Sequence, residues 1–182
     1  MSELRTPRLW LRRWREEDRA PFAAMNADPR VMRHFPAPLD RQASDALLDR
    51  IETHFETLGF GLWAVEVTGD APASGLIGFT GLMPMPVGVP GAGGIEIGWR
   101  LAAHAWHRGY ATEAASAVRD LALGELGLDE LWSMTAVLNR PSRAVMRRLG
   151  MDHHATFEHP ALPPGHRLRP HVVHHLSRDR ER

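Results

Sequence analysis

The stretch from Gly94 to Ala114 constrains the fold of this 182-residue chain more than any other part of the sequence. Over residues 95–99, apolar side chains at every second position alternate with Glu96 and Gly98, which is the period of a strand with two unlike faces. After a short polar turn, apolar residues recur at helical spacing, and one face collects Ala114, Ala115, Val118, Leu121 and Ala122. The stretch therefore predicts a strand, a turn and the start of a helix.

The turn between this strand and helix has the features of an anion-binding site. The first turn of a helix presents unpartnered backbone N–H groups and the positive end of the helix dipole. Gly109 allows close approach to that backbone, the amides of residues 107–112 are the candidate donors, and Arg108 adds a positive charge. Thr112 and Glu113 place a cap-type residue and an acid in the first helical turn. A plain connection, in which Gly109 only makes the turn, is an equally good interpretation of these residues alone.

The composition excludes several classes of chemistry. All 22 basic residues are arginines, so a P-loop lysine and a Schiff-base lysine are both absent. The chain has no cysteine, which rules out disulfides and a cysteine nucleophile. Its formal net charge is zero, which disfavours nucleic-acid and membrane partners. The arginine-rich residues 1–14 do not form a signal peptide, and no apolar run is long enough to span a membrane, so we expect a cytoplasmic protein.

The order of periodic segments predicts an α/β (α+β) protein with one main mixed sheet. Strands are predicted at residues 9–14, 60–67, 76–83, 94–101, 131–138, 151–157 and 171–176. Helices are predicted at 16–25, 40–58, 111–126 and 141–149, with Asp40 as an N-cap and Gly59 and Gly127 as stops. Residues 68–72 form a turn, 84–94 a mobile loop and 158–170 a long loop, and the charged tail at 177–182 is expected to fray. No linker divides the chain, so residues 1–182 are one domain.

The residue order around the central turn resembles the coenzyme A signature of the GNAT superfamily of N-acetyltransferases. The matching residues are Leu101, four intervening positions, and Trp106-His107-Arg108-Gly109-Tyr110-Ala111-Thr112-Glu113-Ala114. Trp106 stands where that signature has Gln or Arg, and this departure is typical of the Rim-type branch, which includes the ribosomal-protein-alanine acetyltransferases. The order of elements is also similar to the GNAT fold, with about seven strands, about four helices and splayed fourth and fifth strands.

The resemblance implies an acetyl-CoA-dependent N-acetyltransferase that transfers acetyl directly to an amine. The acceptor would be a protein N-terminal α-amine or a small-molecule amine. A catalytically silent CoA-binding sensor or interaction domain of the same fold is the alternative, and a phosphate- or nucleic-acid-binding module is disfavoured by the neutral charge. Whether the protein is a monomer or a homodimer is left open.

Glu96 is the best candidate for the base that an attacking amine needs. It lies between two isoleucines and points away from them, and apolar surroundings should raise the pKa of a carboxyl group towards neutrality. In GNAT enzymes a glutamate on this strand often has that role. The alternative is an exposed strand glutamate or a structural partner of an arginine.

The resemblance also assigns cofactor contacts. Gly98 inside the strand predicts a bulge or a close backbone approach, and amides near Trp99 and Leu101 would contact the pantetheine and the oxyanion. Asn139 would contact the pantetheine and Ser142 would protonate the thiolate, although a helix cap and a first-turn residue are the structural alternatives. The cofactor-binding set is therefore Trp99, Leu101, His107, Arg108, Gly109, Tyr110, Ala111, Thr112 and Asn139.

The 11 histidines do not have the spacing of a zinc finger or of an HExxH motif, so we expect no metal site. His159 and His166, in the long loop, are candidates for the acceptor pocket. That pocket is expected between the first two helices, the loop at 84–94 and the loop at 158–170.

Overall fold

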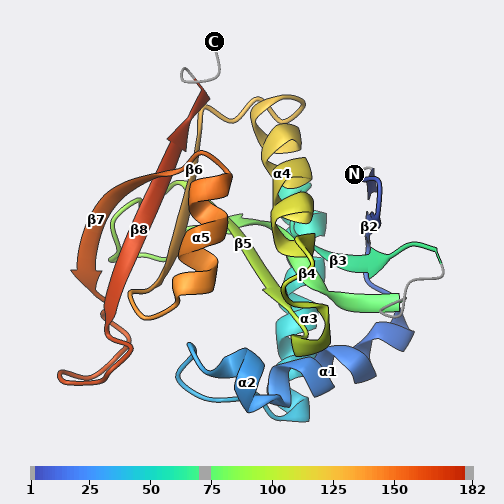
Figure 1. The fold of residues 1–182 in the computed structure, drawn as a ribbon, viewed down its shortest axis with the longest axis horizontal. Coiled ribbons are helices and arrows are strands. Elements are labelled where there is room, and N and C mark those ends of the chain that lie inside the picture. The colour runs from blue at the N-terminus through green and yellow to red at the C-terminus, as the bar shows by residue number, and fades with distance from the viewer. Residues whose placement is uncertain (1–2, 70–74, 179–182) are drawn as a thin grey trace.

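The computed structural model describes residues 3–69 and 75–178, in which eight strands form one open sheet (Figure 1). The strand order is β1-β2-β3-β4-β5-β6-β8-β7, and β5 with β6 is the one parallel pair within these residues. The strands are β1 (Leu4–Arg5), β2 (Leu9–Arg12), β3 (Leu62–Val67), β4 (Gly75–Pro84), β5 (Ile95–Leu101), β6 (Glu130–Ala136), β7 (Asp152–Glu158) and β8 (Pro170–Ser177).

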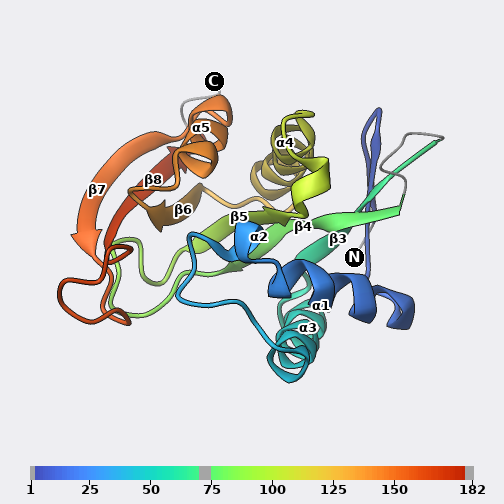
Figure 2. The same cartoon turned by 60° about the horizontal axis from the view of Figure 1, so that its bottom comes forward.

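Five α-helices in the described residues cover both faces of the sheet, α4 and α5 on one face and α1 and α3 on the other (Figure 2). Their bounds are α1 (Arg19–Ala27), α2 (Pro29–Met32), α3 (Arg41–Leu58), α4 (Tyr110–Leu123) and α5 (Arg140–Arg148). There are also two short 3-10 helices in the described residues, η1 (Glu16–Asp18) and η2 (Ala103–Ala105). The sandwich-like core between sheet and helices includes the predicted α4 face, because Ala114, Ala115, Val118, Leu121 and Ala122 are all buried.

The mixed α/β fold predicted from the sequence is confirmed. The structure adds α2 to the four predicted helices, and three other elements differ. β1 is an additional strand. It could not be predicted, because two residues are too few to show a period. The helix predicted at 16–25 divides into η1 and α1 at Asp18. α4 ends at Leu123, and Gly124 takes the C-cap position in place of Gly127. The predicted turn at 68–72 and the charged tail at 177–182 lie partly outside the described residues.

Helix α3 shows how local chemistry fixes the boundaries that the sequence predicts. The Asp40 carboxylate accepts a hydrogen bond from the Ala43 amide at 2.7 Å, so it caps the N-terminus. Gly59 ends the helix with a φ of 76°, a conformation that glycine adopts without steric cost.

The parallel strands β5 and β6 are paired at a single position, Glu96 with Trp132. Beyond that pair the two strands part, which is the splay expected of the fourth and fifth strands. The predicted bulge at Gly98 is absent, because β4 and β5 keep one register from Gly78 with Leu101 to Pro84 with Ile95. The splay is therefore a separation of β5 from β6 and does not involve the pairing of β5 with β4.

The segment at 84–94 is packed, which corrects the expectation of a mobile loop. Met85 and Val89 are buried against Trp132 in a small apolar cluster. Gly91 and Gly94 lie so close to the Trp132 ring that an added Cβ would meet its atoms at 2.7 Å and 2.5 Å. The glycines are therefore used for close contact with an indole, and no periodic pattern could reveal that.

No helix among the described residues is long and apolar enough to cross a membrane.

Candidate active site

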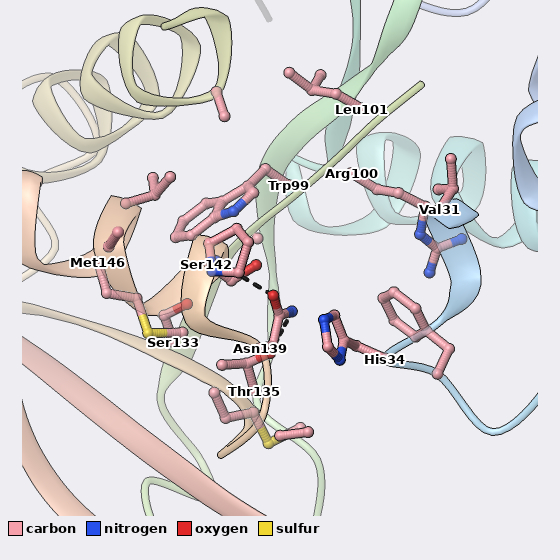
Figure 3. Close-up of a pocket in the computed structure, with 18 of the residues that line it drawn as sticks. Val31, His34, Trp99, Arg100, Leu101, Ser133, Thr135, Asn139, Ser142 and Met146 are labelled. Atoms are coloured by element: carbon pink, nitrogen blue, oxygen red, sulfur yellow. Dashed lines mark hydrogen bonds between the residues drawn. The ribbon is translucent and has the colours of Figure 1, made fainter. Parts of the chain in front are cut away.

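A cavity of about 1220 Å³ lies where β5 and β6 part. Its wall is made by α2 and the residues after it, β4, β5, the turn before α4, β6, α5 and the loop before β8. In Figure 3, Trp99, Ser142 and Asn139 lie on one side, and Val31, His34 and the Arg100 side chain lie on the other. Most predicted cofactor residues line this one cavity, namely Trp99, Leu101, His107, Gly109, Tyr110, Ala111, Thr112 and Asn139.

Glu96 lies at the point of the splay, and its side chain is 9% exposed. The neighbouring Ile97 is buried in the main core, whereas Glu96 lines the cavity, so the two faces of β5 differ as predicted. One carboxylate oxygen accepts a long hydrogen bond of 3.4 Å from the Met134 amide. Burial raises the pKa of Glu96 to about 7, and the Met134 hydrogen bond opposes this only in part. A carboxylate with this pKa can accept and release a proton near neutral pH.

The turn before α4 leaves its amides free, as an anion site requires. Gly109 is the N-cap with a φ of 81°, and the amides of residues 109–112 donate to no group among the described residues. His107 has a φ of 60° and is the one non-glycine residue in the described ranges with a positive value. These amides lie at the N-terminus of a 14-residue helix, where the positive end of the helix dipole also favours an anion.

Arg8 and Glu113 hold this turn in shape. The Glu113 carboxylate accepts hydrogen bonds from the Thr6 hydroxyl at 2.6 Å, the Arg8 amide at 3.0 Å and the Arg8 Nε at 2.7 Å. Arg8 also donates to the Arg108 carbonyl at 2.9 Å, and its guanidinium lies 4.7 Å from the centre of the Tyr110 ring. Burial raises the pKa of Glu113, but the hydrogen bonds outweigh burial and the pKa ends below its ordinary value. Glu113 is thus an ionised structural group.

Arg108 differs from the other predicted cofactor residues. It is exposed and does not line the cavity, and its carbonyl accepts the hydrogen bond from Arg8. The positive charge of Arg108 is near the turn but outside the cavity wall, and its contact with the cofactor stays a prediction.

Asn139 and Ser142 lie at the start of α5. The Asn139 side-chain oxygen accepts from the Ser142 amide at 3.3 Å, so Asn139 is the helix cap that the sequence offered as its structural alternative. Its amide nitrogen donates to the Thr135 hydroxyl at 2.9 Å. One amide hydrogen remains for a ligand, since a side-chain amide carries two. Ser142 lines the cavity beside it.

Trp106, which departs from the family signature, has a clear local role. Its indole N–H donates to the Leu101 carbonyl at 2.8 Å and so ties the turn to the end of β5. The Arg33 guanidinium lies 5.5 Å from its ring centre. Trp106 therefore joins the turn before α4 to the segment that follows α2.

His34 and Arg100, which were not predicted as site residues, also line the cavity on the α2 side. Burial, and then the charges of Arg33 and Arg167, lower the pKa of His34. The His34 Nδ1 is buried and has no hydrogen-bond partner among the residues that the structure describes. The sequence could have indicated Arg100 as a site residue. It follows Glu96 by four residues in the same strand, so strand periodicity places both side chains on one face. His34 stands in a short irregular segment without any period.

The histidines of the long loop are divided between two environments. His159 lines the cavity together with His171 of β8, whereas His166 does not. Burial lowers the pKa of His159 and of His171, so both are neutral at pH 7. The segment at 84–94, expected at the acceptor pocket, does not reach the cavity either, and α2 with the residues after it takes that place. Within the described residues, no group of three histidines or carboxylates is arranged to hold a metal ion.

Comparisons with known proteins agree with this geometry. Residues 8–152 match the model of the acetyltransferase (GNAT) domain. The FsC-acetyl coenzyme A-N(2)-transacetylase of Aspergillus fumigatus is 34% identical over 113 residues, which are 59% of this chain and 46% of that enzyme. The chain thus matches about half the length of that relative. The uncharacterized protein YkkB of Bacillus subtilis is 26% identical over 86% of this chain and 88% of its own length.

Solved structures show the same fold. An acetyltransferase from Agrobacterium tumefaciens is 27% identical, with a TM-score of 0.77 over 97% of this chain and 94% of that one. RimL, the ribosomal L7/L12 alpha-N-protein acetyltransferase, in complex with coenzyme A, is 11% identical, with a TM-score of 0.77 over 97% of this chain and 98% of that one. The splayed strands, the free amides before α4 and the domain match lead to one conclusion: the chain belongs to the GNAT family of acetyltransferases.

Proposed function

We propose that the protein transfers an acetyl group from acetyl-CoA directly to an amine, with both substrates bound at once. The observation that carries this proposal is the position of Glu96. It is a buried carboxylate with a pKa of about 7, at the point where β5 and β6 part, in the same cavity as the free amides of residues 109–112. A base near neutrality and an anion site in one cavity are what amine acylation by a phosphate-bearing donor needs.

The cavity offers a place for each part of acetyl-CoA. The free amides of residues 109–112 would bind the pyrophosphate. The edge of β5 that faces β6 is unpaired beyond Glu96, so backbone groups near Trp99 and Leu101 would pair with the pantetheine as an added strand does. The remaining amide hydrogen of Asn139 would contact the same arm.

The chemistry then uses two side chains and a backbone donor. Glu96 accepts a proton from the acceptor ammonium, directly or through one water molecule, and the free amine attacks the thioester carbonyl. A backbone N–H near Trp99 or Leu101 stabilises the oxyanion of the tetrahedral intermediate. As the intermediate collapses, Ser142 donates a proton to the departing thiolate and takes one from the nitrogen that becomes the amide, so the protons balance. Because the chain has neither cysteine nor lysine, we infer that no acetyl-enzyme forms.

The acceptor belongs to the class of protein N-termini or small-molecule amines. Two of the relatives support an amine acceptor by their names, the N(2)-transacetylase of Aspergillus fumigatus and the alpha-N-protein acetyltransferase RimL. The large cavity volume of about 1220 Å³ accommodates an extended donor together with a second substrate.

An acceptor screen with acetyl-CoA and a panel of amines, aminoglycosides and N-terminal peptides tests the proposal by the release of free thiol. We expect turnover with at least one amine, and an intact protein mass that does not change with acetyl-CoA alone. CoA binding without turnover of any amine would instead favour a silent CoA-binding domain. A stoichiometric acetyl adduct that an amine discharges would refute direct transfer.

A further inference from the structure

Arg100 is a cation in the wall of the cavity that no acid in the described part of the chain neutralises. It is largely buried, and no carboxylate among the described residues lies within ion-pair distance of its guanidinium. Two glutamates line the cavity with it. Of these, Glu113 is paired with Arg8, and Glu96 is bonded to the Met134 amide. Burial without an acid lowers the pKa of Arg100 to about 10, so it still carries its charge at pH 7.

A buried polar chain holds the guanidinium in place. Nη1 of Arg100 donates to the Asn26 side-chain oxygen at 2.6 Å. Asn26 is fully buried, and its amide nitrogen donates to the Ser44 hydroxyl at 2.9 Å, so its oxygen is fixed towards the arginine. The chain of contacts runs from α3 through α1 to β5, and its last member lies in the cavity wall. The guanidinium is therefore held in position before any ligand binds.

The aromatic neighbours orient the guanidinium but do not neutralise its charge. Its carbon lies 4.2 Å from the ring centre of Phe35 and 5.2 Å from that of Phe79. Its Nε is buried and has no hydrogen-bond partner in residues 3–69 and 75–178. A buried charge with one neutral partner and an unsatisfied N–H is costly, and a purely structural position would be filled more favourably by an apolar side chain. Such an arrangement is typical of a group that waits for an anionic ligand.

We propose that Arg100 binds a carboxylate of the acceptor substrate, so that the preferred acceptor is an amine that also carries a carboxylate. This inference rests on the proposed acetyltransfer. The planar guanidinium presents two parallel N–H donors to a carboxylate, which gives both affinity and orientation. Arg100 thereby determines specificity, while Glu96 is the base at the other end of the acceptor.

The spacing of the two residues defines the acceptor further. Glu96 and Arg100 are four residues apart on one strand, so their Cα atoms are separated by roughly 13 Å at about 3.3 Å per residue. The Arg100 side chain extends towards Asn26 of α1. The amine and the carboxylate of the acceptor must therefore be separated by a spacer of several atoms. An ω-amino acid with a long chain or a short peptide meets this condition, and a free α-amino acid does not.

Matched pairs of substrates test the inference in the intact protein. Each pair consists of an ω-amino acid, from glycine to 6-aminohexanoate, and its carboxamide, which has the same amine and no negative charge. The measurement is the ratio of kcat/KM for the acid to kcat/KM for the amide, each expressed per concentration of unprotonated amine, because the carboxamide of a short amino acid is the weaker base. We expect a ratio of about 10 to 100 for the longer spacers, since hydrogen bonds between charged groups contribute that much to binding, and a ratio near one for glycine.

Variants then assign the preference to Arg100. In Arg100→Gln the ratio should fall to about one, and in Arg100→Lys it should be intermediate, because lysine keeps the charge without the fork. Because the amount of folded protein cancels in this ratio, a destabilised variant still gives a valid measure of the preference for the carboxylate. Arg30→Gln is the matched control. Arg30 is an exposed arginine at the same cavity, but it already forms an ion pair with Asp28. The acid-to-amide ratio of Arg30→Gln should therefore equal that of the wild type. A wild-type ratio of one at every spacer would overturn the inference while the proposed acetyltransfer stands.

A binding experiment separates the two proposals if no amine is acetylated. Calorimetry in the presence of CoA compares 5-acetamidopentanoate with 5-acetamidopentanamide, neither of which can react. Tighter binding of the carboxylate, lost in Arg100→Gln, would support the anion subsite even if acetyltransfer fails. Equal binding of both compounds, or binding of neither, would refute it.

Discussion

The substitution Glu96→Gln should make the protein more stable and less active at the same time. In the folded protein the pKa of Glu96 is about 7, against an ordinary value of 4.5. Below pH 4.5 the carboxyl is neutral in both states, so it behaves as Gln does. Between pH 4.5 and 7 the unfolded state ionises first, and native stability falls as pH rises. Above pH 7 the loss is constant at about 3 kcal/mol, from about 1.4 kcal/mol for each pKa unit. Gln removes this loss and keeps a partner for the Met134 amide.

Activity should change in the opposite direction. Without a proton acceptor, turnover should fall by about 100- to 10,000-fold near neutral pH, with little change in acetyl-CoA affinity. The wild-type kcat/KM should rise with pH around 7, where Glu96 ionises. The variant should lack this limb, and its deficit should shrink at alkaline pH, where the amine is already deprotonated in solution.

The two assays are chemical denaturation, carried from well below pH 4.5 up to pH 9, and a pH–rate profile from pH 4.5 to 9. Glu113→Gln is a matched control of opposite sign, because the folded pKa of Glu113 lies below its ordinary value. It should lower stability at neutral pH, and that difference should vanish as pH falls below the folded pKa. A Glu96→Gln enzyme that is less stable at pH 8, with a rate profile parallel to wild type, would refute the assignment of the base and leave His34 or His159 as candidates.

Three further substitutions test other parts of the structure. Gly109→Val should abolish the thermal stabilisation by acetyl-CoA, because a β-branched residue cannot keep a φ of 81°, and a full stabilisation would contradict the anion site. Ser142→Ala should lower turnover more than CoA affinity, and kinetics equal to wild type would return Ser142 to a structural role. Asp18→Ala should lower the free energy of unfolding by about 3–5 kcal/mol in chemical denaturation, because it removes a partner of the buried Arg12. A loss below about 1 kcal/mol would show that the ion pair with Glu66 is sufficient for Arg12.

The sequence predicts the parts of the site that are continuous along the chain. The strand, turn and helix start around Gly109 are visible because periodicity and helix-terminal chemistry act over a few neighbouring residues. The opposite faces of Glu96 and Ile97 follow from strand geometry in the same way. Local patterns therefore identify the candidate base and the anion site.

Features that need two distant segments could not be predicted. Arg100 meets Asn26 across 74 positions, and no local pattern near either residue indicates the contact. The packing of the 84–94 segment depends on Trp132, a residue of another strand. Sequence periodicity reports which side of an element is buried, but the identity of the group on the other side is decided by the tertiary fold.

The clamp between Arg8 and Glu113 has a consequence for the order in which the molecule acquires its binding competence. The hydrogen bonds close a loop of 105 positions, so the N-terminal strand meets the turn before α4 only after most of the chain has been synthesised. Contacts of such separation form late, because a long loop must close first. A ribosome-bound chain that exposes α4 but not yet β6 should not be retained by immobilised CoA, whereas the released full chain should be. Ligand capture would then report completion of the tertiary structure and not merely formation of α4.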